Sequence, residues 1–418
     1  MILLNRQSYE PEFTMTESLH PDNLLRRIAY IALWAYFFTV PFEYSFVLRE
    51  PLESYARVTG ELVLLVGTAA VIVTGRARRW KAFHWLALLY LLLVSISLLW
   101  DQSPTEEAEH ALRQYLQAVP VLLLSWEFAR SVRERTHLIF GYLVGGLISA
   151  LLIMREAFLL HRALYSAFRY SVEAWNPNEL AIVFAVGLPL ALYLALDRSL
   201  RASSIQVWTG WLYLALGSLG LLLTGSRTGL VVGVVGFGAT PFLLSRSSRA
   251  RIYTLLAIFA SLLCVGLTLI PAGTWHILST VGSQVQSGDL DERVKVWRFG
   301  WQAFLESPLF GSGVGSFRWA SGTLYNAHNT YLEVSVEQGV AGLLLILGLI
   351  LSLFARLKHA TASGQVAGIF LLLTWVVAAT VGHLAESRVT WVVFSLAILF
   401  ACDQTSQDAG FQLQPADQ

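Results

Sequence analysis

The chain has 418 residues, of which 55% are apolar and only 14% are charged, and its formal net charge is +1. This apolar content exceeds what one soluble core can bury, so we expect the surplus surface to face lipid. A net charge near zero excludes an electrostatic nucleic-acid footprint, and two cysteines are too few for a disulfide framework or a metal cluster.

Residues 1–27 are polar and mixed in charge, which predicts a cytoplasmic tail. About twelve apolar runs follow, each able to cross roughly 30 Å of hydrocarbon, at residues 28–48, 58–74, 83–100, 112–128, 137–157, 177–196, 207–224, 228–245, 252–270, 331–355, 365–384 and 388–402. The sequence thus predicts an all-α polytopic membrane protein, with spans one to nine in 28–270 and spans ten to twelve in 331–402. A long loop at 271–330 separates the two groups, and residues 403–418 form a second cytoplasmic tail.

The distribution of basic residues sets the predicted orientation. With the N-terminus in the cytoplasm, 17 of the 29 Lys and Arg residues fall in inner segments, nearly all of them very short loops, as the positive-inside rule requires. The loop at 271–330 then faces outward. Because it is the longest segment predicted outside the membrane, we expect the active site there.

Three arginines, Arg155, Arg162 and Arg169, recur every seven residues after the fifth predicted span. On a continuous helix they would share one face, which could guide an anionic carrier lipid or simply contact headgroup phosphates. The next motif, Asn-Pro-Asn at 176–178, is typical of a helix N-cap with proline at the first helical position.

Arg227 lies in a tight turn between two apolar runs, with no loop to place it in water. A guanidinium at that depth is costly unless it is paired. Two interpretations stay open, namely phosphate binding and an arginine that extends to lipid headgroups. Around it, Gly225, Gly229 and Gly233 recur at four-residue intervals, which predicts the close approach of a neighbouring helix.

The outer loop contains a predicted amphipathic helix at the membrane surface, because Val294, Trp297, Trp301 and Leu305 fall on one helical face. Arg293 stands near the start of this helix. It is either a second phosphate-binding group or part of a solvated face.

Asp289 and Asp291 form an Asp-x-Asp pair, which could hold a divalent cation on a diphosphate. Asp289 is also followed three residues later by Glu292, the pattern of a helix N-cap with a capping-box partner. The capping pattern is favoured, so we predict no metal.

His328 and Asn329 open the tenth predicted span. A histidine at the water–lipid boundary can act as a general base, because its unperturbed pKa is about 6.5. The alternative is a residue at a helix start that only makes hydrogen bonds. Upstream, Gly-Ser-Gly-Val-Gly at 311–315 follows no strand, so it is interpreted as a flexible approach to His328 and not as a phosphate-binding loop.

Together these motifs resemble the superfamily of O-antigen ligases and O-antigen polymerases. The resemblance rests on Asn176–Ala181, Gly225–Gly229, Arg293 with Trp297, Pro308 with the glycines of 311–315, and His328 with Asn329. Family ligases carry His-[Asn/Ser/Gln]-x9-Gly-x-x-Thr. The chain agrees at His328, Asn329 and Gly339, and departs at Gly342, where the threonine would be.

The resemblance implies a GT-C-like multi-pass glycosyltransferase of the bacterial inner membrane, with its active site facing the periplasm. It would transfer a glycan from undecaprenyl diphosphate to a sugar hydroxyl of lipid A–core, with inversion and without a metal or other cofactor. Arg227 and Arg293 would bind the diphosphate, and His328 would be the catalytic base. The supporting candidates are Arg169, Arg298 and Asn329.

Two alternatives remain at this point. Within the superfamily, a polymerase would join carrier-linked repeat units instead of modifying lipid A–core. From another class, a membrane transporter would predict more ionisable residues in mid-span and an inverted internal repeat, and the sequence shows neither pattern.

Overall fold

The computed structural model describes residues 21–46, 54–75, 77–101, 103–161, 168–172, 175–197, 200, 202–245, 247–280, 293–323 and 325–401. Within these residues the chain is helical and has no β-strand, which confirms the predicted all-α class. The predicted tail at 403–418 and most of the tail at 1–27 lie outside the described residues, so both stay predictions.

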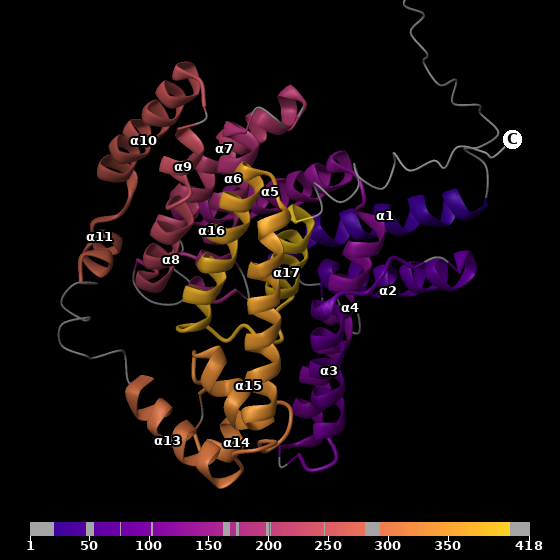
Figure 1. Cartoon of the computed structure of the whole chain (residues 1–418). Coiled ribbons are helices and arrows are strands. Elements are labelled where there is room, and N and C mark those ends of the chain that lie inside the picture. Colours follow the sequence, from indigo (N-terminus) through magenta and orange to yellow (C-terminus); the bar gives the residue numbers. More distant parts are fainter. Residues whose placement is uncertain are drawn as a thin grey trace, which may run out of the picture.

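Figure 1 shows the order and arrangement of the helices. They are α1 (Pro21–Thr39), α2 (Tyr55–Thr74), α3 (Ala82–Ser97), α4 (Thr105–Phe128), α5 (Val132–Met154), α6 (Pro177–Leu196), α7 (Ser204–Leu223), α8 (Arg227–Phe237), α9 (Thr240–Leu244), α10 (Arg249–Leu269), α11 (Ala272–Ser279), α13 (Arg293–Glu306), α14 (Phe317–Ser321), α15 (Thr330–Arg356), α16 (Ala362–Ala379) and α17 (Arg388–Phe400).

Seven helical segments of the described chain are long and apolar enough to cross a bilayer. They are Tyr55–Thr74, Val132–Leu159, Pro177–Leu196, Ser204–Leu223, Arg227–Leu244, Thr330–His359 and Ala362–Ala379. The other predicted spans fall on α1, α3, α4, α10 and α17, of which α3 and α17 are apolar but only 16 and 13 residues long. The chain is therefore a multi-pass membrane protein, whereas the count of about twelve spans stays a prediction.

α6 is the central helix of the bundle, and its first turn belongs to the site described below. It packs against α5, α7, α8 and α16, and 94% of the residues in its most apolar stretch are buried. Tyr213 of α7 packs against the bare surface of Gly187, and its hydroxyl donates to Phe184 O at 3.2 Å. A helix that is apolar all round is expected where other helices, and not lipid, surround it.

α8 approaches its neighbours closely through glycines, as their spacing predicts. A Cβ on Gly229 would lie 2.3 Å from the Cβ of Ala181 on α6, and one on Gly233 would lie 2.9 Å from Leu221 Cδ1 on α7. Neither position has room for a side chain. Gly225 has a different role, because its φ of 58° closes the turn between α7 and α8.

The tenth predicted span, 331–355, falls within the candidate span Thr330–His359, but its helix is not continuous. α15 is broken at Gly339, where φ is 65° and ψ is −164°, a combination open essentially to glycine. Backbone carbonyls of the preceding loop fill the break, since Val340 N donates to Pro308 O at 2.8 Å. The apolar pattern continues through Gly339 and does not reveal a single residue that leaves the helical conformation.

Gly339→Ala should lower stability, with backbone strain alone contributing about 1–3 kcal/mol. The new Cβ would also lie 2.4 Å from the carbonyl carbon of Leu309. The midpoint of thermal unfolding in detergent measures the effect. Gly348→Ala in the second half of α15 is the control, because its Cβ would meet only Leu86 at 3.5 Å. Equal midpoints for the two variants would contradict the break.

The glycine-rich segment at 311–315 is a fixed turn, not the flexible approach that the sequence suggested. Gly311, Gly313 and Gly315 have φ values of 70°, 107° and 76°. A Cβ on Gly311 would lie 2.3 Å from the carbonyl carbon of Glu337, and Gly313 N donates to Glu337 O at 2.9 Å. These glycines are needed for close backbone packing, and they hold the first half of α15 in place.

α13 packs one face on the start of α15 and leaves another exposed. Trp297 lies on the packed face, where its indole Nε1 donates to Ala327 O at 2.7 Å. Val294, Trp301 and Leu305, predicted to share its face, are exposed. An exposed apolar strip suits a membrane-surface helix, and contact with lipid stays a prediction.

Arg155 and Arg169 do not lie on one continuous helix, so the shared face that such a helix would give does not apply to them. The helical turns after α5 end at Leu159, and Arg162 lies outside the described residues. Arg155 is exposed, whereas Arg169 belongs to a separate segment whose Tyr170 N donates to the last residue of α7. Regular spacing carried no information here, because the helix ends between the first arginine and the third.

Candidate functional site

Two helix starts meet at the turn between α7 and α8. Asn176 caps α6 by accepting a hydrogen bond from Asn178 N at 2.9 Å, and Pro177 occupies the first turn as predicted. Ser226 caps α8 by accepting from Gly229 N at 2.9 Å. The Ser226 hydroxyl also donates to Asn178 Oδ1 at 2.8 Å, which ties the two first turns together.

Arg169 reaches the same point from the segment before α6. Its Nη2 donates to Asn178 Oδ1 at 2.7 Å. Gly225 leaves space for this arginine, because a Cβ there would lie 3.2 Å from Arg169 Cγ. α11 holds the segment, since Thr274 Oγ1 donates to Phe168 O at 2.6 Å.

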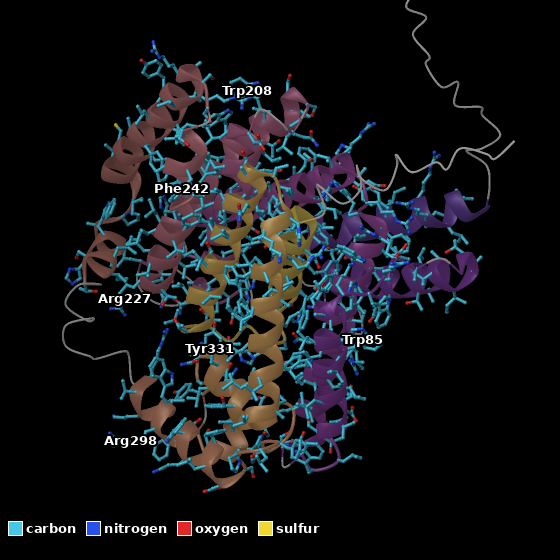
Figure 2. All side chains as sticks on the ribbon, viewed as in Figure 1. Trp85, Trp208, Arg227, Phe242, Arg298 and Tyr331 are labelled. Atoms are coloured by element: carbon cyan, nitrogen blue, oxygen red, sulfur yellow. The ribbon has the colours of Figure 1, made fainter. Side chains whose placement is uncertain are left out.

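A cavity of about 470 Å³, here called the charged cavity, opens at this junction. Its described lining residues are Arg169, Asn178, Gly225, Arg227, Thr228, His276, Ile277, Thr280 and Arg293. Three of these residues are arginines and none is acidic, and Arg227 Nη1 donates to Thr280 Oγ1 at 3.2 Å. Figure 2 shows Arg227 at the start of α8. Three guanidinium groups around one polar cavity suit an anion with several oxygens, such as a diphosphate.

His328 is close enough to Arg293 for their charges to interact, but it is not one of the described lining residues of the charged cavity. Its backbone is left-handed, with a φ of 45° that non-glycine residues adopt uncommonly. Trp297, one turn after Arg293, binds the carbonyl of Ala327 and so ties α13 to the residue before His328. One helix therefore contributes an arginine to the cavity and fixes the histidine segment.

The imidazole of His328 is neutral at physiological pH. Burial lowers its pKa, and the charges of Arg293 and His383 lower the pKa further, to about 4. A neutral imidazole can accept a proton from a hydroxyl group. An anion bound at Arg293 would offset part of the positive charge and raise the pKa of His328 toward its ordinary value.

Residues 212–347 match a protein-family model described as O-antigen ligase. This match supports membership of the chain in the O-antigen ligase and polymerase superfamily. The matched region contains Arg227, Arg293 and His328, and with them most of the charged cavity. Members of this family are membrane enzymes of the glycosyltransferase type, and the spanning helices of this chain agree with such a class. No curated protein matches the chain significantly.

A second cavity lies farther along α8. This apolar cavity, of about 230 Å³, is lined by Leu188, Ser218, Leu221, Leu222, Leu230, Gly233, Val234, Phe237, Phe259, Leu262 and Trp275. α8 contributes Arg227 to the charged cavity and Val234 to the apolar cavity. Likewise, α11 contributes His276 to the charged cavity and Trp275 to the apolar cavity. A molecule with an anionic head and an apolar chain would find both environments adjacent.

The supporting candidates of the ligase-type site occupy different places. Arg169 lines the charged cavity. Asn329 caps α15, where its Oδ1 accepts from Leu332 N at 3.2 Å. Arg298 is exposed on α13, apart from Arg227 in the view of Figure 2, and is not among the described lining residues of the cavity.

The prediction of no metal stays a prediction. Asp289 and Asp291, the pair considered as ligands, lie outside the described residues, as does the capping partner Glu292.

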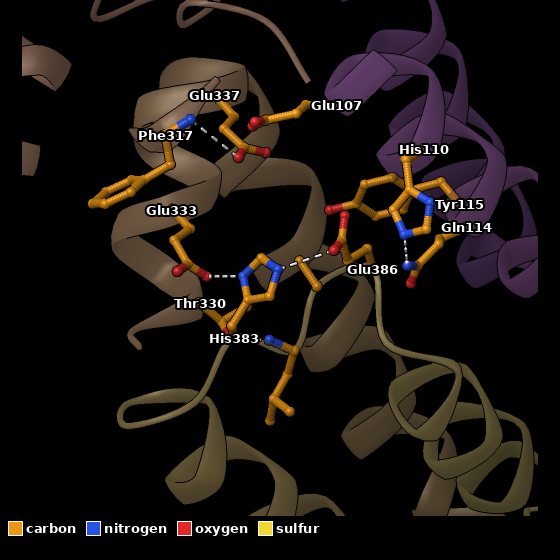
Figure 3. A network of polar contacts seen from close by, with 12 residues as sticks. Glu107, His110, Gln114, Tyr115, Phe317, Thr330, Glu333, Glu337, His383 and Glu386 are labelled. Atoms are coloured by element: carbon orange, nitrogen blue, oxygen red, sulfur yellow. Dashed lines mark hydrogen bonds and ion pairs between the residues drawn. The ribbon is translucent and has the colours of Figure 1, made fainter. Parts of the chain in front are cut away.

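Sequence reasoning missed a buried acid–base network next to the superfamily's histidine segment (Figure 3). His383 lies between two carboxylates, with Nδ1 2.6 Å from Glu333 and Nε2 3.0 Å from Glu386. Asn178 and His276 of the charged cavity were missed as well. Two signals in the sequence could have indicated these residues. They are the polar stretch at 383–388 between two apolar runs and the second asparagine of Asn-Pro-Asn.

A third, acidic cavity of about 90 Å³ adjoins this network. Glu43, Glu179, His383 and Glu386 contribute its charged lining. Glu43 forms a buried ion pair at 2.8 Å with Arg388. Since Glu179 follows Asn178 directly, the first turn of α6 separates the charged cavity from the acidic one.

Proposed function

We propose that this protein transfers a glycan from undecaprenyl diphosphate to a sugar hydroxyl of lipid A–core, at the periplasmic face of the bacterial inner membrane. The transfer inverts the anomeric carbon and needs no metal. The observation that carries the proposal is the charged cavity, where Arg169, Arg227 and Arg293 come together beside His328.

The cavity is suited to a diphosphate leaving group. When the anomeric C–O bond breaks, the diphosphate takes both electrons, and its growing negative charge must be met by preorganised positive groups. Arg227 and Arg293 offer forked N–H donors, and Arg169 is held in place by Asn178. The first turns of α6 and α8 add the partial positive charge of helix N-termini.

His328 is the proposed base. The acceptor hydroxyl attacks the anomeric carbon from the face opposite the diphosphate, forms the new glycosidic bond and gives its proton to the imidazole. The bound diphosphate offsets the charge of Arg293, so His328 becomes a stronger base once the donor is in place. Proton removal is thereby coupled to donor binding.

The apolar cavity is the proposed site for the start of the carrier's hydrocarbon chain. Neighbouring residues of α8 and α11 line the two cavities. Burial of each CH₂ group contributes about 0.8 kcal/mol, so even a few buried carbons raise affinity measurably.

Val234→Trp should fill the apolar cavity and raise the KM for a long-chain donor about tenfold, the loss of one or two buried CH₂ groups. The KM of a donor on a short prenyl diphosphate should change little. Val231→Trp is the matched control, because Val231 is also exposed on α8 but does not line this cavity. Equal effects of both variants, or no dependence on chain length, would place the chain elsewhere.

A polymerase is the second candidate, and one position favours it. Gly342 stands where family ligases carry threonine, and a Cβ there would lie 2.3 Å from Gln338 Cβ. The purified protein should therefore be given carrier-linked repeat units alone and, separately, with lipid A–core. Product only with lipid A–core indicates a ligase, and lengthened carrier-linked chains indicate a polymerase. No product in either reaction would contradict both.

Excess EDTA should leave the transfer rate unchanged, because the proposed charge stabilisation comes from arginines. The measurement compares initial rates with EDTA and with added Mg²⁺ or Mn²⁺. Strict dependence on a divalent cation would restore Asp289 and Asp291 as candidate ligands.

A further inference from the structure

The loop between α16 and α17 connects the charged cavity with the His328 segment. Val381 O accepts a hydrogen bond from Arg293 Nη1 at 3.4 Å. The carbonyl of the next residue, Gly382, accepts from Thr330 Oγ1 at 2.8 Å. Because Thr330 follows His328 by two residues, the α16–α17 loop contacts both parts of the site that the proposed function requires.

His383 attaches this loop to α15, as Figure 3 shows. Its imidazole lies between Glu333 at 2.6 Å and Glu386 at 3.0 Å, and donation to both carboxylates requires a proton on each ring nitrogen. Burial lowers the pKa of His383, but the two carboxylates outweigh burial and hold the pKa well above its ordinary value. His383 is therefore a cation at neutral pH.

The first half of α15 is held at its end by backbone contacts with residues 311–315 and at its start by side-chain contacts with the α16–α17 loop. It begins next to the left-handed His328 and ends at the break at Gly339, so no continuous helix fixes either end. Glu333, with a side chain only 2% exposed, lies in the middle of this half. Buried ion pairs pay a large desolvation cost and contribute little net stability, which suggests a role in geometry.

We propose that His383 is a positioning residue, whose charged link between Glu333 and Glu386 holds the first half of α15 so that His328 stays beside Arg293. The inference rests on the proposed function, because it assigns His383 a task in the same transfer reaction.

Other ionisable groups face this network from the helices packed around it. Glu337 belongs to α15, Glu179 to α6, His110 to α4 and Arg388 to α17. They are two carboxylic acids and two basic residues, so the charge of His383 depends chiefly on its direct partners Glu333 and Glu386. The charge of His383 also lowers the pKa of His328. A neutral residue at position 383 should therefore disturb geometry and, separately, raise the pKa of His328.

The main test is His383→Gln in the full chain, reconstituted in lipid nanodiscs and assayed with carrier-linked donor and its acceptor. We expect kcat to fall about 100-fold, the cost of misplacing a reacting group by about 1 Å. The donor KM should change less than about threefold, because the arginines remain. The acid limb of the kcat/KM profile should move to higher pH, since His328 loses a neighbouring positive charge.

His383→Arg separates the effect of the positive charge at position 383 from that of the shape of the imidazole. Arginine keeps the positive charge and offers donors to both carboxylates, and the acidic cavity of about 90 Å³ beside His383 gives room for the longer side chain. We expect activity within about tenfold of the natural protein. The control is His110→Gln, which removes a neighbouring histidine bonded at 2.8 Å to Gln114 and should leave kcat unchanged.

Full activity of His383→Gln would overturn the inference. The inference would also be overturned if His383→Arg lost as much activity as His383→Gln and the acid limb of the kcat/KM profile did not move. If His383→Gln fails to fold, Glu386→Gln breaks the same link at its more exposed end, where the side chain is 18% exposed, and must lower kcat. Failure of the natural protein to transfer any carrier-linked glycan would instead refute the proposed function, independently of these variants.

Discussion

Arg227→Lys is expected to lower kcat/KM for glycan transfer about 100-fold, although the positive charge is kept. Arg227 begins α8 and lines the charged cavity with Arg169 and Arg293. A lysine ammonium is a compact charge and cannot reproduce two parallel N–H contacts to phosphate oxygens. Transfer in isolated membranes, normalised to the amount of protein, measures the effect.

Arg298→Lys is the matched control for this substitution. Arg298 was a supporting candidate from sequence, but it is exposed on α13 and lies outside the described lining of the cavity. We expect its replacement to change the rate less than about twofold, as for most surface substitutions. A loss equal to that of Arg227→Lys would mean that the anion binds outside the charged cavity.

His328→Asn is expected to lower kcat about 1,000-fold, the contribution of a well-placed general base. Asparagine gives a more specific test than alanine, because it tolerates the left-handed backbone at this position, where φ is 45°. A lost rate then reports the missing imidazole and not a misfolded turn. His161→Asn is the control, since His161 has a φ of 49° and lies at the far end of the α5 turns.

The pH dependence of the natural protein gives an independent check on His328. Its pKa in the free protein is about 4, and a base acts only when it is deprotonated. As far as His328 is concerned, kcat/KM should therefore stay level from pH 8 down to about 5 and fall only as the pH approaches about 4. An acid limb near pH 6.5 that disappears in His328→Asn would contradict the buried environment described here.

The sequence predicted the helices well and their interruptions poorly. Long apolar runs identify α2, α6 and α16 directly, because nearly every residue must be apolar in such helices. The break at Gly339 was invisible, since one glycine in an apolar run is compatible with a straight helix. Its cause lies in the backbone of the loop around Leu309, a contact between segments that periodicity cannot report.

The candidate site was also predicted only in part, because sequence patterns report local features and not contacts between distant segments. Arg227 drew attention because a charge between two spans is costly, and His328 because it follows a long outer loop. Arg169 drew attention through its regular spacing from other arginines, whereas its place beside Gly225 and in one cavity with Arg227 is a product of the fold. His383 and Glu333 are separated by 50 residues in the chain, so their contact is a product of the fold.

The short helix α11 places two environments one residue apart. Trp275 borders the apolar cavity and His276 borders the charged one. For an amphiphile bound across both cavities, the boundary between apolar and polar surroundings would therefore be set by side chains of the protein and not by the thickness of the bilayer. An amphiphile seated there would keep the same depth in thin membranes, thick membranes and detergent micelles.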